Sequence, residues 1–344
     1  MLYFFWLPLL GIRELLSSYF SLDTLLITIL LNFLLLFDLI LDLTKNKMKI
    51  GYVFLFFIFS AFIVLINKQA LALFDIVLAV YLIRSLPFHV FLNYISIISI
   101  FNLFLFSFLY FIDFNQSDLV VMPKGDAYNL GFNNTNSASS FLMINLMILV
   151  FWVYLKNKFF TLFFFPLFYL IYIITLSRTS FVAEIIFYIS IIFSFLKFNF
   201  FLRFFPIIIY ILTFVLIIFS REYSWINELF TTRFFIYDQI LSSMSFFNYL
   251  FGVKLPEDQP MDSSFLSLLF NGGIIYVLLF LMLYEKFYRN NFQKHIYIYL
   301  PFIFFVLACG FSENLFSSFN LISLTFFKIL YDNKFFNEKL RGVK

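Results

Sequence analysis

The stretch FGVKLPEDQPMDSSF, residues 251–265, runs directly into LSLLFNGGIIYVLLFLMLY, residues 266–284. The first stretch carries a lysine, three acids and two prolines, whereas the second is almost continuously apolar. A run of about 20 apolar residues matches the thickness of the hydrocarbon core of a bilayer. The junction at Asp262-Ser263-Ser264 therefore predicts the point where the chain enters a membrane after a polar excursion outside it.

The whole chain has the composition of a membrane protein. Hydrophobic residues make up 63% of the 344 residues and charged residues only 12%, which is more apolar surface than a soluble core needs. We predict an all-α polytopic membrane protein with a single integral membrane domain over residues 1–344. Reading the apolar runs between polar breaks gives about twelve helical spans, near 2–19, 22–42, 50–66, 70–86, 89–112, 138–155, 159–176, 180–196, 203–219, 263–284, 296–310 and 314–331.

The basic residues set the orientation of these spans. With the N-terminus in the cytoplasm, Arg13 lies inside the first span and the other Lys and Arg residues divide unequally between the two sides. The inner side has Lys45, Lys47, Lys49, Arg84, Lys156, Lys158, Lys197, Arg203, Lys286, Arg289, Lys294, Lys328, Lys334, Lys339, Arg341 and Lys344; the outer side has Lys68, Lys124, Arg178, Arg221, Arg233 and Lys254. This excess of inner positive charge predicts that both termini are cytoplasmic.

Two long segments then fall on the outer face. One is a smaller extracytoplasmic loop at 113–137, and the other is a large extracytoplasmic loop at 220–262, between the ninth and tenth spans. Inner connections are short and basic, so long outer loops require another reason, and function is the usual one. We therefore expect the chemistry of this protein at the outer surface of the membrane.

Residues 224–250 of the large loop have the pattern of an amphipathic helix. On a wheel of 100° per residue, the polar residues gather on one arc and the apolar residues on the opposite arc. Arg233 lies in the middle of the apolar arc, and Phe235 and Asn248 break the pattern, which allows a kink in the helix. A guanidinium on a buried face needs an anion or a group of carbonyls; the alternative is an arginine that extends along the membrane surface to reach water.

Two further arginines fall on the same side. Arg178 lies in TLSRTS, the tight connection between two spans, and Arg221 lies at the outer end of the ninth span. A lone arginine at a helix end is usually a membrane anchor. Three arginines around one opening favour a diphosphate ligand, because the planar guanidinium binds phosphate oxygens in pairs.

The acids of the outer face are the candidates for a general base. The only histidines, His89 and His295, map to the cytoplasmic side, so an outer base must be a carboxylate. Asp262 has the best position, because it opens the helix that re-enters the membrane; capping that helix is the structural alternative. The other candidates are Glu222, Glu228, Asp238, Glu257, Asp258 and Glu313. The single cysteine and the lack of a ligand motif predict no bound metal and no cofactor.

Over residues 125–330 the chain resembles the bacterial O-antigen and capsule polysaccharide polymerases of the Wzy type, which belong to one superfamily with the O-antigen ligases. Asp262 stands where the ligases typically carry histidine, and Thr135 stands where proline is common in the first motif. The resemblance rests on YNLGFNNTNSAS (128–139), LSRTS (176–180), the spacing from Arg233 to Gly252, DSSFLSLLFNGGI (262–274) and FSENLF (311–316).

The resemblance implies a GT-C-like membrane glycosyltransferase in the bacterial cytoplasmic (inner) membrane. Its substrates would be donor and acceptor glycans linked to undecaprenyl diphosphate, joined at the outer face without a metal and with inversion of the anomeric centre. The expected partners are membrane lipid, a chain-length regulator and a flippase. Binding to nucleic acid is not expected. The implied catalytic residues are Asp262, Arg233 and Arg178, and the implied substrate-binding residues are Arg221, Glu222, Asn136, Gly252 and Glu313.

Three other functions stay open at this point. An O-antigen ligase would use a lipid A core acceptor, and aspartate in place of histidine at position 262 argues against it. A flippase or other transporter would carry its charges in a cavity at the middle of the membrane, where Asp38, Asp75 and Glu184 are the predicted acids. An inert scaffold of an export complex would not need the off-pattern Arg233.

The predicted orientation can be tested with single cysteines in a Cys309→Ala background. Cysteine at Ser242 or Asp258 should react in whole cells with a thiol reagent that does not cross membranes, and cysteine at Asn46 or Asn290 should not. Labelling confined to the second pair would invert the orientation.

Overall fold

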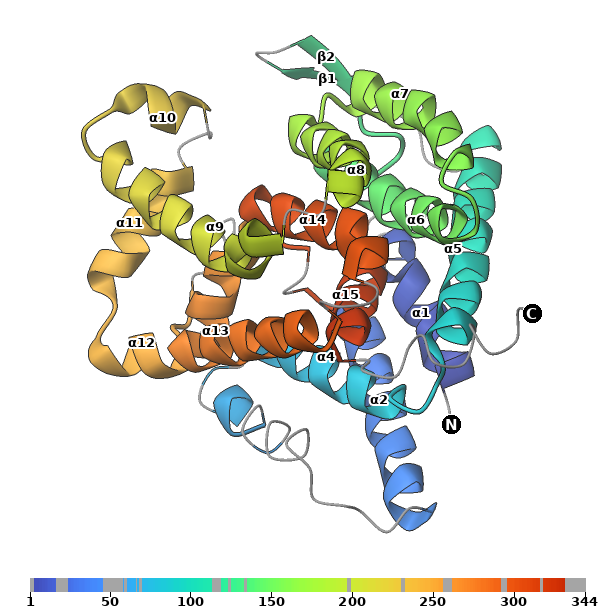
Figure 1. Ribbon diagram of the computed structural model, residues 1–344, viewed down its shortest axis with the longest axis horizontal. Coiled ribbons are helices and arrows are strands. Elements are labelled where there is room, and N and C mark those ends of the chain that lie inside the picture. Colours follow the sequence, from blue (N-terminus) through green and yellow to red (C-terminus); the bar gives the residue numbers. More distant parts are fainter. Residues whose placement is uncertain are drawn as a thin grey trace.

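Helices dominate the chain, in agreement with the all-α prediction (Figure 1). The computed structural model describes residues 3–16, 24–45, 58, 61–65, 67, 70–112, 119–122, 125–132, 135–196, 199–229, 233–255, 262–291, 296–315 and 318–331. In chain order the helices are α1 (Tyr3–Glu14), α2 (Thr24–Lys45), α4 (Leu71–Leu82), α5 (Phe88–Phe111), α6 (Thr135–Lys156), the 3-10 helix η3 (Phe160–Phe164), α7 (Phe165–Thr175), α8 (Arg178–Leu196), α9 (Asn199–Ser220), α10 (Ser224–Leu229), α11 (Arg233–Ser243), α12 (Phe246–Phe251), α13 (Ser264–Asn291), α14 (Ile296–Ser312) and α15 (Leu321–Tyr331).

Four of the described helices are long and apolar enough to cross a membrane: Phe88–Phe111, Thr135–Lys156, Arg203–Ser220 and Ser264–Arg289. Shorter apolar helices lie at Leu26–Leu41, Leu71–Leu82, Phe160–Thr175, Ile298–Phe311 and Leu321–Tyr331. These helices support a membrane protein. The count of twelve spans and the orientation stay predictions, and the span expected at 50–66 lies mostly outside the described residues.

The outer surface of the bundle has the character of a lipid-facing surface. On α5, Ile97, Phe101, Phe104 and Phe108 are all more than half exposed and recur every three or four residues. This spacing places them on one face of the helix. Contiguous apolar surface of this kind is rare on soluble monomers and is normal against lipid.

α6 is the central helix of the bundle. In the most apolar stretch of α6, 78% of the residues are buried, whereas in that of α9 only 33% are. The reason is its sequence, which is apolar on every face, and a helix of that kind is stable only when neighbours surround it. Phe151 of α6 stacks on Phe302 of α14 with 4.5 Å between ring centroids. α5, α7, α8 and α15 also pack against α6.

Charged side chains join helices at the end of the bundle predicted to be cytoplasmic. Arg203 of α9 donates to both carboxylate oxygens of Glu285 in α13, and Arg289 donates to the same carboxylate. Lys328 of α15, fully buried, donates to the carbonyl of Ile83 at 2.9 Å. This carbonyl also accepts from the N–H of Leu86 at 3.0 Å, so the ammonium adds a second donor. A cation at the C-terminus of α4 is favoured by the helix dipole.

The large loop differs from the prediction of one amphipathic helix over 224–250. The structure divides this segment into α10, α11 and α12. α12 begins after Ser245, whose hydroxyl accepts a hydrogen bond from the backbone N–H of Asn248 at 3.3 Å. Serine is a favoured N-cap, and such a cap starts a new helix. Figure 1 shows the three short helices along one edge of the molecule, beside α9 and α13.

A close backbone approach fixes the end of this loop to α13. Gly252 and Gly273 have φ values of +91° and +71°, which favour glycine. A Cβ on Gly252 would lie 2.6 Å from the carbonyl of Asn271, and a Cβ on Gly273 would clash with the carbonyl of Leu250. Gly273 also bends α13, because its backbone is extended within the helix.

The bend leaves carbonyl groups of α13 without their helical hydrogen bonds, and other segments of the same protein donate hydrogen bonds to them. The backbone N–H of Val253 donates to the carbonyl of Phe270 at 2.6 Å. The amide of Asn67 donates to the carbonyl of Asn271 at 3.0 Å and to that of Val253 at 3.2 Å. A helix can bend within lipid only where such partners exist.

The smaller loop contains a feature that the sequence did not predict. β1 (Leu119–Met122) and β2 (Gly125–Tyr128) form an antiparallel hairpin, with Leu119 paired to Tyr128 and Met122 to Gly125. The hairpin lies beside α7. The loop also ends earlier than expected, because α6 begins at Thr135.

Gly273→Ala should destabilise the fold, because alanine meets both a positive φ and the carbonyl of Leu250. We expect a loss of about 1–3 kcal/mol, measured as a lower midpoint of thermal unfolding in detergent. Ile274→Ala is the matched control: it also places alanine in the bend, at the next position, where the side chain is 43% exposed and no positive φ is required. An equal loss in both variants would contradict the close-approach explanation.

Candidate functional site

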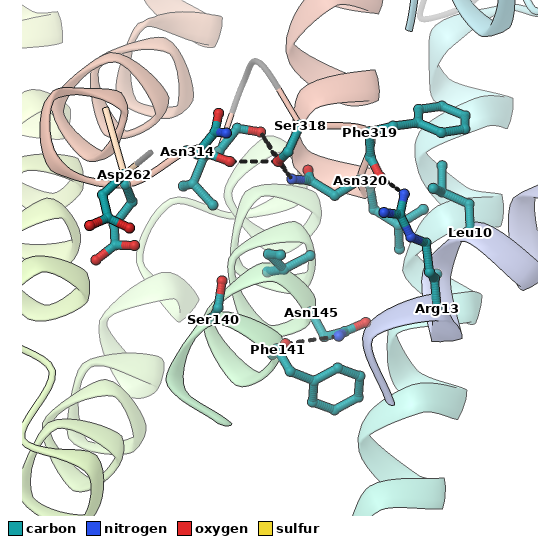
Figure 2. A pocket seen from close by; sticks show the side chains of 15 residues that line it. Leu10, Arg13, Ser140, Phe141, Asn145, Asp262, Asn314, Ser318, Phe319 and Asn320 are labelled. Carbon is teal, nitrogen blue, oxygen red and sulfur yellow. Dashed lines mark hydrogen bonds between the residues drawn. The ribbon is translucent and has the colours of Figure 1, made fainter. Parts of the chain in front are cut away.

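A polar cavity of about 360 Å³ lies where four parts of the chain meet. Figure 2 shows the side chains that line it. They come from the end of α1, the first turns of α6, the residue before the entry of α13 and the connection from α14 to α15. The lining residues are Leu10, Gly11, Arg13, Ser140, Phe141, Ile144, Asn145, Asp262, Glu313, Asn314, Leu315, Ser318, Phe319, Asn320 and Leu321.

Hydrogen bonds hold the residue pair after Asp262 against the end of α14. The hydroxyl of Ser264 donates to the carbonyl of Glu313 at 2.8 Å, and that of Ser263 donates to Gly310 at 3.4 Å. The carbonyl of Ser263 accepts the first helical hydrogen bond of α13, from the N–H of Ser267 at 2.8 Å. The helix therefore starts on Ser263, and the side chain of Asp262 is directed to another partner.

That partner is Arg233, the arginine on the apolar arc of the loop. Its Nε lies 2.8 Å from the Oδ2 of Asp262, and the two side chains are 25% and 27% exposed. Burial raises the pKa of Asp262 above its ordinary value, and the charge of Arg233 acts in the opposite direction. A carboxylate placed in this way is a better proton acceptor than an exposed one.

Tyr237 lies one turn after Arg233 in α11 and faces the same pair. Its side chain is 2% exposed and its ring lies 6.4 Å from that of Phe270 in α13. Burial and the nearby charge of Asp262 raise the pKa of Tyr237 to about 12. The phenol therefore stays protonated at neutral pH, and its ring closes one side of the ion pair.

Glu313, expected from the sequence as a substrate-binding residue, is the second acid that lines the cavity. It follows α14 directly, and its N–H donates to the carbonyl of Cys309 at 2.7 Å. Asp262 and Glu313 thus come from consecutive helices whose ends are joined by the hydrogen bond of Ser264.

Arg13 is the cavity residue that sequence reasoning did not single out. It lies at the end of α1, and its guanidinium donates to the carbonyl of Phe319 at 3.3 Å (Figure 2). The signal was present, because an ionisable residue within an apolar span is by default a functional candidate. Its place beside the last connection depends on a contact across 306 positions of the chain.

A buried amide pair fixes the floor of the cavity. The amide nitrogen of Asn102 in α5 donates to the carbonyl of Gly11 and to the side-chain oxygen of Asn145 in α6, both at 2.9 Å. Asn145 in turn donates to the carbonyl of Phe141 at 2.9 Å. These bonds join α1, α5 and α6, and they use the polar atoms of Asn145 for the fold.

The remaining predicted site residues lie elsewhere. Arg221 is exposed and forms an ion pair with Asp238, so it binds α11 rather than the cavity. Arg178, the first residue of α8, and Glu222, in the turn after α9, are exposed, and so is Asn136 in the first turn of α6. None of the three predicted arginines is among the residues described as lining the cavity.

Gly252, predicted to bind substrate, lies against the bend of α13 and has a clear structural role there. Of the other candidate acids, Glu257 and Asp258 lie outside the described residues, and the side chain of Glu228 is not described. Among the described residues, no group of three or more His, Cys, Asp or Glu side chains could hold a metal ion.

Comparison with known proteins gives no relatives. No family model matches the chain, and no curated protein and no solved structure is significantly similar to it. We therefore infer the function from the residues and from the geometry of the cavity.

The Arg233–Asp262 pair predicts a pH-dependent effect of Arg233→Gln on stability. The variant loses the charge that favours ionised Asp262, so the folded-state pKa of Asp262 rises further. Above that pKa the protein must hold a half-buried carboxylate without its cation; below it the carboxyl group is neutral. Stability should fall by about 1–3 kcal/mol at pH 8, and the loss should shrink as the pH is lowered through the pKa of Asp262.

Thermal unfolding across pH measures this effect, and Asp262→Asn in the same chain should restore most of the stability at pH 8. Tyr237 and Glu313 are the other titratable groups facing this region. Arg221→Gln is the control, since an exposed pair contributes little. A pH-independent loss in Arg233→Gln would argue against the assigned pair.

Proposed function

We propose that this chain polymerises oligosaccharide repeat units linked to undecaprenyl diphosphate, as a Wzy-type polysaccharide polymerase at the outer face of the bacterial cytoplasmic membrane. The observation that carries the proposal is the pairing of Arg233 with Asp262 beside a polar cavity. It supplies a cation suited to phosphate and a carboxylate with a raised pKa, both where the chain re-enters the membrane.

The reaction would be a direct displacement. A hydroxyl oxygen of the acceptor attacks the anomeric carbon of the donor, and the bond from that carbon to the phosphate oxygen breaks with inversion. The proton of the hydroxyl passes to the carboxylate of Asp262. The departing lipid diphosphate takes the electron pair, and Arg233 stabilises the negative charge that develops on it.

The ion pair adds an order of events to this scheme. While Arg233 and Asp262 form an ion pair, each side chain neutralises the charge of the other. A donor diphosphate competes for Arg233, because guanidinium binds phosphate oxygens in a bidentate manner. Asp262 then loses the charge that lowered its pKa and becomes a stronger base. Donor binding would in this way activate the acceptor site.

The alternative of a transporter has one specific observation in its favour. Glu184 of α8 is 1% exposed, and within the described part of the chain neither of its carboxylate oxygens has a hydrogen-bond partner. Asp75 of α4 is 3% exposed, and one of its oxygens also lacks a partner. Acids buried within spans often mark proton or ion pathways. An O-antigen ligase remains the nearest alternative within the same superfamily.

Purified protein in lipid nanodiscs, supplied with lipid-linked repeat units, should produce a ladder of longer glycans. Asp262→Asn should reduce the rate by about 10²- to 10⁴-fold, the usual contribution of a general base. Asparagine keeps the shape of the side chain, and the helix starts on Ser263, so helix capping should be unaffected. Arg233→Lys should also fail, because an ammonium keeps the charge and loses the two-pronged geometry.

Asp126→Asn and Arg84→Lys are the matched controls, because neither residue lines the cavity, and both should keep the ladder. A normal ladder from Asp262→Asn would rule out its role as the base. Transfer of lipid-linked sugars across liposome membranes without new glycosidic bonds, lost in Glu184→Gln, would establish the transporter instead.

A further inference from the structure

Helix α12 of the large loop is short and apolar, and none of its residues is buried within the described structure. Phe246 and Phe247, its first two residues, are 73% and 70% exposed, and their rings lie 6.2 Å apart as one apolar patch. A helix of this length is marginal in water without packing, and exposed phenylalanine rings are unfavourable there. An apolar partner for this side of α12 would stabilise it.

The position of α12 along the bundle indicates which partner covers it. Arg203 and Glu285 form an ion pair at the end of the bundle predicted to be cytoplasmic, and charges at helix ends lie at a membrane boundary. With the usual rise of an α-helix, the stretch from Gly273 to Glu285 is about 18 Å long, and the hydrocarbon core of a bilayer is about 30 Å thick. A tilt of this stretch lowers its height further. In a bilayer, the bend at Gly273 and the carbonyl of Leu250 beside it then lie within the hydrocarbon.

A second ion pair fits the opposite boundary. Arg221, at the end of α9, binds Asp238 of α11. Between Arg203 and Arg221, α9 is about 27 Å long, so the two pairs are separated by nearly the thickness of the hydrocarbon core. From Asp238 to Gly252 the chain passes from the level of this second pair to the level of the bend. Residues 239–253, which make this descent, include no charged residue.

Hydrogen bonds within the loop satisfy polar groups at the break between α11 and α12. The hydroxyl of Ser243 donates to the carbonyl of Ile240 at 2.8 Å. The hydroxyl of Tyr249 donates to the carbonyl of Leu241 at 2.8 Å, and Ser245 caps α12. A helix can break at membrane depth only where the backbone groups that it frees have such partners. The junction is therefore compatible with lipid.

The exposed surface of α13 beside α12 is also apolar. Ile274, Leu278 and Met282 are 43%, 53% and 67% exposed, and they follow one another by one helical turn, so they form a strip on one face of the helix. The strip begins next to Gly273, where α12 packs on α13. Lipid that contacts this strip is therefore adjacent to α12.

We infer that α12 is a re-entrant part of the large loop, and that Phe246 and Phe247 contact the acyl chains of the outer leaflet. The partner of this surface is bilayer lipid. The inference differs from the expectation, drawn from the sequence, that all of residues 220–262 lie outside the membrane. It does not rest on the proposed function, because a polymerase, a ligase and a transporter are equally compatible with it.

Spin labels can measure this contact in the full chain, reconstituted in nanodiscs of phosphatidylcholine and phosphatidylglycerol. Single cysteines replace Phe246 or Phe247 in a Cys309→Ala background and carry a nitroxide. Leu278→Cys, on the exposed strip of α13, is the lipid control, and Asp126→Cys, exposed in the β hairpin, is the aqueous control. Power saturation then compares collisions of the label with oxygen, which concentrates in hydrocarbon, and with a nickel chelate, which stays in water.

At Phe246 and Phe247 the ratio of oxygen to nickel collisions should match that at Leu278 and be several times that at Asp126. A label at Ser242, nearer the outer ion pair, should give an intermediate ratio. Ratios at both phenylalanine positions equal to that at Asp126 would overturn the inference and place α12 in water.

Few collisions with both reagents would also overturn it, because protein would then cover the patch. Spectral broadening that disappears on mixing with unlabelled chain would identify that cover as a second copy. Phe247→Trp provides an independent measurement if the cysteine variants fail to fold: its added fluorescence should be quenched by lipids with brominated acyl chains. The added fluorescence of Asp126→Trp should not be quenched, and equal quenching in the two variants would contradict the lipid contact.

Discussion

The close approach of the loop backbone at Leu250 and Gly252 to the bend of α13 at Asn271 and Gly273 is the constraint on which the large loop depends. It brings the backbone of the loop against the bend of α13, and the Arg233–Asp262 pair holds the loop a second time where α13 begins. α11 lies between these two attachments. Its apolar face packs inward, with Phe234 6.0 Å from the ring of Phe311 in α14. A long polar segment thus becomes a part of the bundle.

This arrangement explains why an arginine can lie on the apolar side of α11. The helix is held by burial of Phe234, Tyr237 and Ile240, so the guanidinium of Arg233 is carried to Asp262 by packing rather than by its own attraction. Desolvating two charges costs free energy that offsets much of their attraction, so a half-buried ion pair is weak evidence for stability. The same burial raises the pKa of Asp262, as the proposed role of this carboxylate as a base requires.

The sequence was sufficient to predict features that are local. Apolar runs located most of the helices to within a few residues. In lipid, the backbone N–H and C=O groups of each run must form hydrogen bonds within the run, which makes it a helix. The off-pattern Arg233 and the entry position of Asp262 were also visible, because both depend on the period or the end of one helix. Glu313 was assigned to the site from its motif, and it lines the same cavity as Asp262.

Features that depend on distant contacts could not be predicted. The helical period of 224–250 does not contain the break before α12: Ser245 caps this helix, and its place in the fold is set by packing against α13. The sequence gives no sign that Gly252 lies against the carbonyl of Asn271, or that Arg13 meets Phe319. α15 begins at Leu321, later than the apolar run suggested, because Asn320 and Ser323 cap the helix and the connection before it lines the cavity.

The size and charge of the cavity bear on how a polymer could grow beside it. A space of about 360 Å³ has room for the tip of a glycan and not for a chain. Under the proposed function, a long polymer would therefore remain outside, and the end that enters would present its reacting hydroxyl near Asp262. In the proposed function, that end is the non-reducing sugar of the acceptor, and the growing donor chain lies on the side of Arg233 and the loop helices. Each addition then replaces only the small acceptor in the cavity, and the space required there does not increase as the polymer lengthens.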